Sequence, residues 1–190
     1  GPLIILLIGC LCVFALQRVP DLRSTPLFCI VRVLMIIDIV NIVVGKVHDI
    51  PDEVMGKEIF DPISITIVLI VQCIRWFAQL LALPLLSSLH FLSLYRPVRF
   101  RKLRLIHGYS IVAFFLSMSV LLTVPLLTEC CGFTYYVDGA FWAFDFGKPG
   151  TALYTQLNLV LQAVCVIMML VCDVFILYKV YSMRSKTVLS

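Results

Sequence analysis

Few polar side chains lie inside the long apolar stretches of this sequence, and two groups of them have the spacing to act together. Gln72, Arg75 and Gln79 are spaced i, i+3 and i+7, which places them on one face of a helix. Asp38 and Asn41 are three residues apart and share a helix face in the same way. The guanidinium and the amides predict the polar wall of a ligand cavity, whereas an ion pair between Asp38 and Arg75 predicts a lock between two helices without a ligand. Both interpretations stay open.

The composition identifies the solvent around these helices. Of the 190 residues, 62% are hydrophobic and 14% are charged, whereas soluble domains have about 45–50% apolar and about 25% charged residues. A water-soluble protein of this size would expose much of that apolar area, which excludes an ordinary cytosolic enzyme, a nucleic-acid-binding module and a disordered tail. We therefore expect an all-α membrane protein that has the lipid bilayer, and no nucleic acid, among its partners.

The apolar residues form five runs, and a helix of about 20 residues spans the hydrocarbon layer. We expect one transmembrane domain, residues 1–190, with spanning helices at about 2–16, 27–45, 63–94, 105–127 and 152–178. The first run is short and starts at Gly1 without a Met, so we interpret it as a spanning helix whose start is missing. The third run is long for one crossing, and Pro84 within it predicts either a kinked, tilted helix or a re-entrant hairpin.

The charges of the connectors choose between these alternatives and orient the chain. Ten Lys and Arg lie in three segments, 17–26, 95–104 and 179–190. Three Lys and Arg and eight Asp and Glu lie in the other two, 46–62 and 128–151. By the positive-inside rule, the first three are inner segments, the other two are outer loops, and the N-terminus is outside a multi-pass cell-membrane protein. A re-entrant hairpin would move the five cations of 95–104 outside, so we expect a single tilted span.

The second outer loop carries the clearest local motif. Asp138-Gly139 stands between two arms rich in aromatic residues, which predicts a β-hairpin because type I′ turns need positive φ at both central residues. With Tyr135 and Trp142 on its arms, the hairpin is predicted to form a lid at a ligand entrance; the alternative is an aromatic belt at the membrane interface. No Cys or His spacing typical of a zinc site occurs, so we expect no metal and no cofactor.

Taken in order along the chain, these stretches resemble nematode serpentine chemoreceptors, a type of seven-transmembrane G protein-coupled receptor. The resemblance is carried by residues 20–25 and the run with Asp38 that follows, by 75–97, by the outer loop 130–146, and by 177–179. Of the receptor types, Srv is the most similar, and Srx comes second because of the Cys131-x-Phe133-x-Tyr135 run. The resemblance covers essentially all 190 residues and implies a partial seven-transmembrane bundle with five spanning helices and an outer-loop hairpin, truncated after helix 5.

The resemblance also implies a function and its residues. It implies a receptor that binds an external small molecule or peptide and signals to a cytosolic heterotrimeric G protein, in the membrane of sensory-neuron cilia. The candidate ligand-binding residues are Gln72, Arg75, Gln79, Tyr135 and Trp142. The candidate intramembrane lock comprises Asp38, Asn41 and Arg75. The surface that faces the G protein or anionic lipid is expected to comprise His90, Arg96, Arg99, Arg101, Lys102 and Arg104.

The sequence departs from the family pattern at two places. The Asn-Arg pair that closes the third helix in the family is replaced by Leu89-His90, so the arginine that contacts the G protein and holds the resting state is absent. The family's disulfide between the outer loop and the third helix implies Cys130 or Cys131 as one partner. The place of the other partner falls near Ile65, where there is no cysteine, so the partner stays unassigned.

Two further functions remain as alternatives. In a membrane transporter or channel subunit, the face that carries Gln72, Arg75 and Gln79 would line the pathway. A truncated receptor that does not signal is the other alternative. Neither G-x-S-x-G nor H-E-x-x-H occurs, so we expect no enzymatic activity and no catalytic residue.

Overall fold

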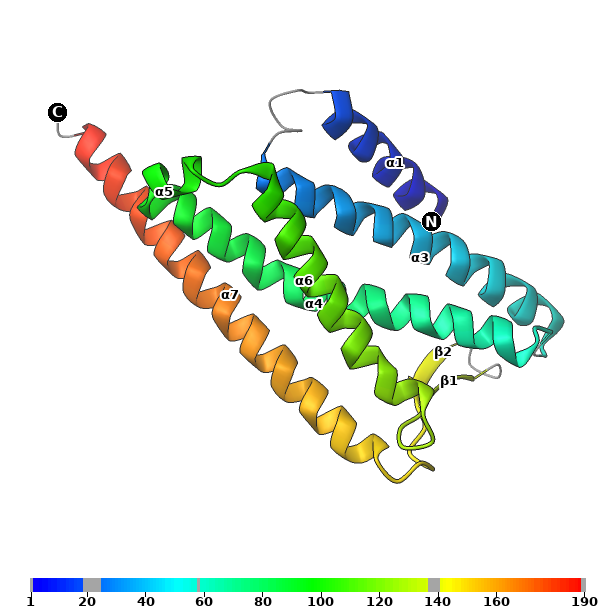
Figure 1. Cartoon of the computed structure of the whole chain (residues 1–190). Coiled ribbons are helices and arrows are strands. Elements are labelled where there is room, and N and C mark those ends of the chain that lie inside the picture. The colour runs from blue at the N-terminus through cyan, green and yellow to red at the C-terminus, as the bar shows by residue number, and fades with distance from the viewer. Residues whose placement is uncertain (1, 19–24, 58, 137–140, 189–190) are drawn as a thin grey trace.

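The computed structural model describes residues 2–18, 25–57, 59–136 and 141–188. In order, its elements are α1 (Pro2–Arg18), α3 (Pro26–Met55), α4 (Pro62–Tyr95), α5 (Pro97–Arg101), α6 (Leu105–Thr123), the 3-10 helix η1 (Val124–Leu127), β1 (Phe133–Tyr136), β2 (Phe141–Phe144) and α7 (Thr151–Val188). The long helices form one bundle, and the two strands lie at one end of it (Figure 1). We call this the hairpin end, and we call the opposite end, which carries α5 and residues 96–104, the basic end.

The long helices have the length and composition of membrane spans. Within the described residues, four segments meet both requirements: Pro26–Met55, Pro62–Tyr95, Leu105–Leu127 and Thr151–Arg184. Of an 18-residue apolar stretch of α7, only 6% is buried inside the structure. Its exposed apolar side chains are therefore suited to contact the hydrocarbon of a bilayer. The 17-residue helix α1 packs against α3 as a further member of the bundle. The predicted all-α membrane fold is confirmed.

Two helices are longer than the sequence predicts. Helix α3 continues to Met55, ten residues past its expected end, so most of the expected outer loop 46–62 is helical. The helix stops at Gly56, whose φ of 62° is a left-handed conformation that glycine adopts without steric cost. Helix α7 also continues ten residues past 178, to Val188, through the expected inner segment.

Helix α4 is continuous although it contains Pro84, so the third run is a single helix and not a re-entrant hairpin. Proline has no N–H, and the carbonyl of Leu80, four residues earlier, therefore lacks its helical donor. One turn later, the Ser88 hydroxyl donates a hydrogen bond to the carbonyl of Pro84 at 2.7 Å.

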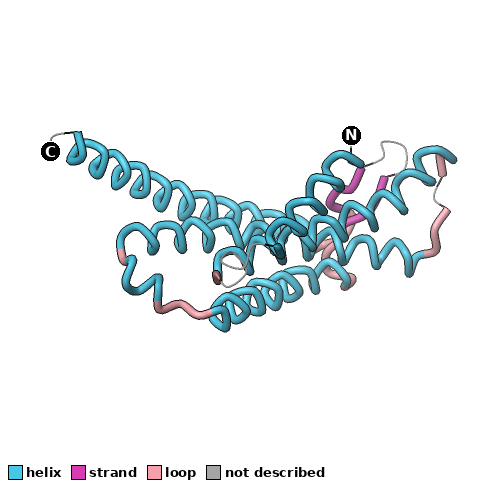
Figure 2. Tube along the Cα trace, turned by 90° about the horizontal axis from the view of Figure 1, so that it is seen from above, coloured by secondary structure: helices cyan, strands magenta, loops and turns pink. Residues whose placement is uncertain are grey.

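Helix α4 contacts α3, α6 and α7 and lies at the centre of the bundle (Figure 1), which Figure 2 shows from above. Ala78 and Ala82 on α4 are fully buried, and such small side chains allow neighbouring membrane helices to approach closely. Ile30 of α3 and Phe115 of α6 complete this cluster with no exposed surface. This packing fixes how far α3 and α4 are shifted relative to each other along the bundle, and so which of their polar residues meet.

The predicted β-hairpin is confirmed. Strands β1 and β2 are antiparallel, with Phe133 opposite Phe144 and Tyr135 opposite Trp142. The predicted Asp138-Gly139 turn lies outside the described residues. Below the hairpin, aromatic side chains pack on a second apolar cluster, which comprises Leu69, Cys73, Leu126 and Cys131. This packing places the strands against the hairpin-end half of α4.

Candidate functional site

A half-buried ion pair joins Asp38 of α3 to Arg75 of α4. The Arg75 Nε–H donates to Asp38 Oδ1 at 2.7 Å, and the Gln79 side-chain amide donates to the same oxygen at 2.6 Å. Arg75 and Gln79 share one carboxylate because residues at i and i+4 lie one above the other on a helix. The side-chain oxygen of Asn41 is buried and has no hydrogen-bond partner among the described residues. Asp38 and Arg75 therefore make the contact that a helix–helix lock requires, whereas the side-chain oxygen of Asn41, the third predicted member, does not take part in it.

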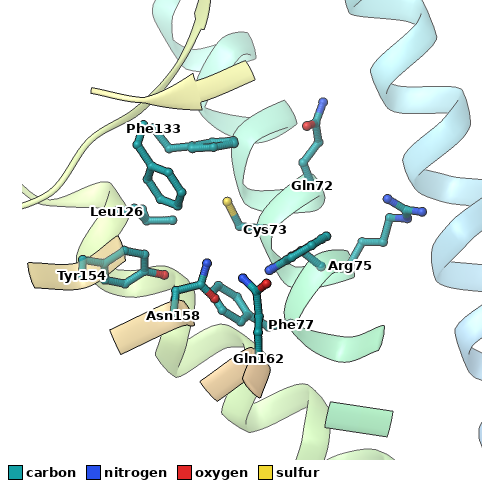
Figure 3. Close-up of a pocket in the computed structure, with 11 residues that line it drawn as sticks. Gln72, Cys73, Arg75, Phe77, Leu126, Phe133, Tyr154, Asn158 and Gln162 are labelled. Atoms are coloured by element: carbon teal, nitrogen blue, oxygen red, sulfur yellow. The ribbon is translucent and has the colours of Figure 1, made fainter. Parts of the chain in front are cut away.

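Arg75 also lines a cavity of about 350 Å³ between α4, α7 and the hairpin (Figure 3). The other lining residues are Gln72, Cys73, Trp76 and Phe77 of α4, Leu126 of η1, Phe133 and Phe144 of the hairpin, and Tyr154, Asn158 and Gln162 of α7. Small-molecule sites occupy about 300–1,000 Å³ and combine apolar walls with a few polar groups. The cavity has that size and that composition.

The hydrogen-bonding capacity of the cavity lies mainly in its carboxamides. Asn158 and Gln162 are directed into the cavity from α7 (Figure 3). The side-chain oxygen of Asn158 is buried and has no partner among the described residues. The Tyr154 hydroxyl, by contrast, donates to the carbonyl of Leu122 at 2.7 Å. A ligand in the cavity would thus meet amide groups between aromatic faces.

The five predicted ligand-binding residues are divided among three places. Gln72 and Arg75 line the cavity. Gln79 is bound to Asp38 instead. Tyr135 and Trp142 are absent from the lining and pack on a buried histidine of α3, His48, with ring centroids 5.2 and 5.8 Å away. The spacing in the sequence therefore located the α4 wall of the cavity but not the position of the hairpin aromatics.

Sequence reasoning missed the α7 wall of the cavity, although a signal for it exists. Tyr154, Asn158 and Gln162 recur every four residues on one face of a long apolar helix. The two amides in that row mark the polar face. Trp76 and Phe77 carry no comparable signal, because aromatic residues in an apolar run are typical of ordinary packing.

The basic end carries the predicted G protein or lipid-facing cations. All five are exposed around α5: Arg96, Arg99, Arg101, Lys102 and Arg104. His90 is exposed and lines a second cavity of about 490 Å³ between α4 and α7. Beside it, the Ser87 hydroxyl donates to Asp173 of α7 at 3.0 Å. Polar contacts thus join α4 to α7 at the level of His90.

The two candidate disulfide residues carry free thiols in the structure. The sulfur atoms of Cys130 and Cys131 lie 3.2 Å apart. Burial, together with the contact to Cys130, raises the pKa of the Cys131 thiol above its ordinary value. Cys131 and Cys73 belong to the same apolar cluster, although the sequence places Cys73 more than two turns below the expected partner position. The disulfide stays a prediction.

The arrangement of the helices is that of a rhodopsin-like G protein-coupled receptor. The chain matches the crystal structure of squid rhodopsin with a TM-score of 0.82 at 16% sequence identity, over 96% of this chain and 52% of that chain. It therefore spans about half the length of that receptor. The family model of the serpentine type 7TM GPCR chemoreceptor Srx matches residues 6–190, so the chain belongs to the Srx family. No curated protein matches the sequence.

The family match confirms the predicted receptor class and the location in a membrane that the chain crosses several times. It corrects the choice between types, because the sequence motifs placed Srv first and Srx second. The Cys131-x-Phe133-x-Tyr135 run, on which the second choice rested, lies at the start of the hairpin and extends through β1.

Proposed function

We propose that this chain forms the ligand-binding half of a chemosensory receptor, and that an external small molecule binds in the cavity between α4, α7 and the hairpin. The supporting observation is the cavity itself, whose walls combine aromatic faces with amide groups. Its volume of about 350 Å³ suits a small molecule better than a peptide.

The ligand that suits this cavity carries no net charge. Arg75 is the charged residue of the lining, and its Nε lies 2.7 Å from the carboxylate of Asp38, so its charge is already balanced. Moving an ionised group into an apolar site is costly unless the site supplies an opposite charge. Gln72, Asn158 and Gln162 offer neutral donors and acceptors instead. We therefore propose a neutral molecule with hydrogen-bonding groups on an apolar skeleton.

The same geometry supplies a route from the ligand to the helices. Arg75 belongs both to the cavity and to the contact between α3 and α4. A ligand that hydrogen-bonds to the guanidinium changes the strength of that contact, and it favours one helix arrangement if it binds that arrangement more tightly.

The cavity predicts that substitution of one polar residue of α7 weakens the response to ligand, whereas substitution of another leaves it unchanged. Asn158→Leu should lower the potency of active ligands about tenfold or more, because a hydrogen bond to a buried group is lost. Gln156→Leu is the matched control, since Gln156 is exposed on the same helix and outside the lining. Full-length receptor variants in cultured cells would be assayed by calcium response against neutral alcohols, ketones and amides alongside carboxylates. A hit list dominated by carboxylates, or equal effects of the two substitutions, would contradict the proposal.

We further propose that the hairpin end faces the outside and that the basic end faces the cytosol, with the N-terminus outside. The sorting of Lys and Arg supports this orientation. The basic end then offers His90 and the five cations around α5 to a heterotrimeric G protein, or to anionic lipid at about 1 kcal/mol per cation. The proposed location in sensory-neuron cilia rests on the family resemblance alone.

Thiol labelling of intact cells tests the orientation and the coupling surface together. A membrane-impermeant maleimide should label the exposed Cys130, and Cys130→Ser should remove that signal. In the Cys130→Ser background, Val98→Cys on α5, where the native side chain is 69% exposed, should be labelled only after permeabilisation. Labelling of Val98→Cys on intact cells would place the basic end outside and exclude its contact with a G protein.

A further inference from the structure

We infer that His48 and the carboxylates of Asp49 and Asp52 form a proton-binding site at the hairpin end, and that the bound proton fastens the hairpin to α3. This function goes beyond ligand recognition in the cavity, and it does not depend on the identity of the ligand.

His48 connects three segments that are separate in the sequence. Its side chain is only 2% exposed. The imidazole stacks on Phe60, with ring centroids 5.1 Å apart and planes at 21°. Tyr135 of β1 meets it edge-on at 5.2 Å, and Trp142 of β2 lies at 5.8 Å. The ring is therefore the contact through which both strands rest on α3.

Each nitrogen of the imidazole faces a carboxylate of the same helix. Nδ1 lies 3.1 Å from Asp49 Oδ1, and Nε2 lies 3.7 Å from Asp52 Oδ2. Asp52 is fully buried, and its other oxygen accepts the backbone N–H of Ile59 at 3.0 Å. Both His48 Nε2 and Asp52 Oδ2 are buried without a hydrogen-bond partner among the described residues.

A neutral imidazole does not satisfy this arrangement in either tautomer. It carries one N–H, so one of its two nitrogens always directs a lone pair at a carboxylate oxygen. Buried polar atoms without partners are costly. A second proton turns both nitrogens into donors, pairs Nε2 with Asp52 Oδ2, and balances the charge of a fully buried carboxylate. It also places a cation among aromatic faces, which attract cations.

The other ionisable groups around the ring leave the site acidic. Lys46 reaches Asp49 with 4.0 Å between Nζ and Oδ2, but its side chain is 49% exposed and does not contact Asp52. Glu53 is exposed on the same turn. From β1, Tyr135 adds no charge, because burial, and then the charges of Asp49, Asp52 and Glu53, raise the pKa of its phenol.

The α4 side chain that lies closest to Asp49 around Gly45 is the neutral amide of Gln72. A Cβ placed on Gly45 would lie 3.8 Å from the Gln72 amide nitrogen and 3.9 Å from Asp49 Oδ2, so a neutral amide is the α4 side chain beside Asp49. Among the described residues, the charged groups that the structure places around His48 are three carboxylates and one exposed ammonium, those of Asp49, Asp52, Glu53 and Lys46.

Proton binding to His48 affects the hairpin, which forms one wall of the ligand cavity. Phe133 and Phe144 of the hairpin line the cavity, whereas Tyr135 and Trp142 of the same strands rest on His48. The docked hairpin is the state that binds the second proton. Because the docked state is the one that binds the proton, docking is stronger at acidic pH than at alkaline pH.

Hydrogen exchange of the full-length receptor in lipid nanodiscs measures docking without a ligand. After correction for intrinsic exchange rates, amides of residues 141–144 should be at least about tenfold better protected at pH 5.5 than at pH 7.5. His48→Gln should remove this pH dependence. His107→Gln, which changes an exposed histidine at the other end of the bundle, should retain it.

A second variant distinguishes loss of the proton from loss of the fold. In Asp52→Asn, the side-chain oxygen still accepts the N–H of Ile59, and the amide nitrogen takes the place of Oδ2, 3.7 Å from His48 Nε2, as a neutral donor facing a lone pair. Protection should then be high at both pH values. The inference is overturned if the wild-type protein shows equal protection at pH 5.5 and 7.5. It is also overturned if His48→Gln or Asp52→Asn retains the wild-type pH dependence.

Discussion

Arg75→Leu in the full-length receptor is expected to abolish the response to ligand while the protein still reaches the cell surface. The substitution removes a cavity wall and the guanidinium contact to Asp38. The fold survives because the Gln79 amide, 2.6 Å from the same carboxylate oxygen, keeps Asp38 hydrogen-bonded. Dose–response curves and surface labelling of the same cells measure the two effects separately. A normal response would mean that the guanidinium takes no part in ligand recognition or in signalling.

The reverse substitution serves as the control for the ion pair. Asp38→Leu leaves the Arg75 cation without its partner between the helices, and breaking such a pair costs about 3–5 kcal/mol when it is fully buried. We expect a smaller but clear loss of surface expression, since both side chains are about one third exposed. Combining Asp38→Leu with Arg75→Leu should recover expression but not the response. If the double variant is expressed no better than Asp38→Leu alone, the charge of Arg75 is not the cause of the loss.

Gly108→Leu is expected to prevent α6 from packing on α3. A Cβ at Gly108 would lie 3.0 Å from the Cα of Pro26 and 3.2 Å from its carbonyl oxygen, so the new side chain meets backbone that cannot rotate away. Small residues at membrane-helix interfaces serve this close approach. Overpacking costs about 1–3 kcal/mol in a core where side chains can adjust, and we expect a loss at the upper end of that range.

Thermal denaturation in detergent and surface expression would both measure this loss. Ala113→Leu is the matched control, because Ala113 lies on the same helix with an exposed side chain. The control should have wild-type stability. Equal stability of the two variants would show that α6 and α3 do not meet at Gly108.

The helical bundle could be predicted from the sequence because the features that specify it are visible in short stretches of the chain. Long apolar runs and the sorting of Lys and Arg depend only on solvent, and no distant contact is needed to recognise them. The predicted end of α3, at residue 45, was wrong because the true end depends on contacts with residues that are distant in the sequence. Residues 46–55 are polar and contain Pro51, which is typical of a loop, yet they are helical because His48 and Asp52 are buried beneath the hairpin.

The candidate site was predictable only on the helix where its polar residues stand out. Gln72 and Arg75 are conspicuous in an apolar run, and they do line the cavity. The hairpin residues Tyr135 and Trp142 were expected at the ligand, but they pack on His48 instead. Strand alternation predicts which face of the hairpin a residue lies on, but not which part of the protein that face contacts. That information came from a contact across more than 80 residues, between β1 or β2 and His48.

Pro84 divides α4 between the two cavities described above. The first is lined by α4 residues before the proline, and the second by residues on both sides of it down to His90. Because one backbone hydrogen bond of the helix is missing at Pro84, bending there costs less than elsewhere along the helix. The half of α4 that carries Arg75 can therefore change its angle to the half that carries Ser87, the partner of Asp173, at a lower cost than in an uninterrupted helix.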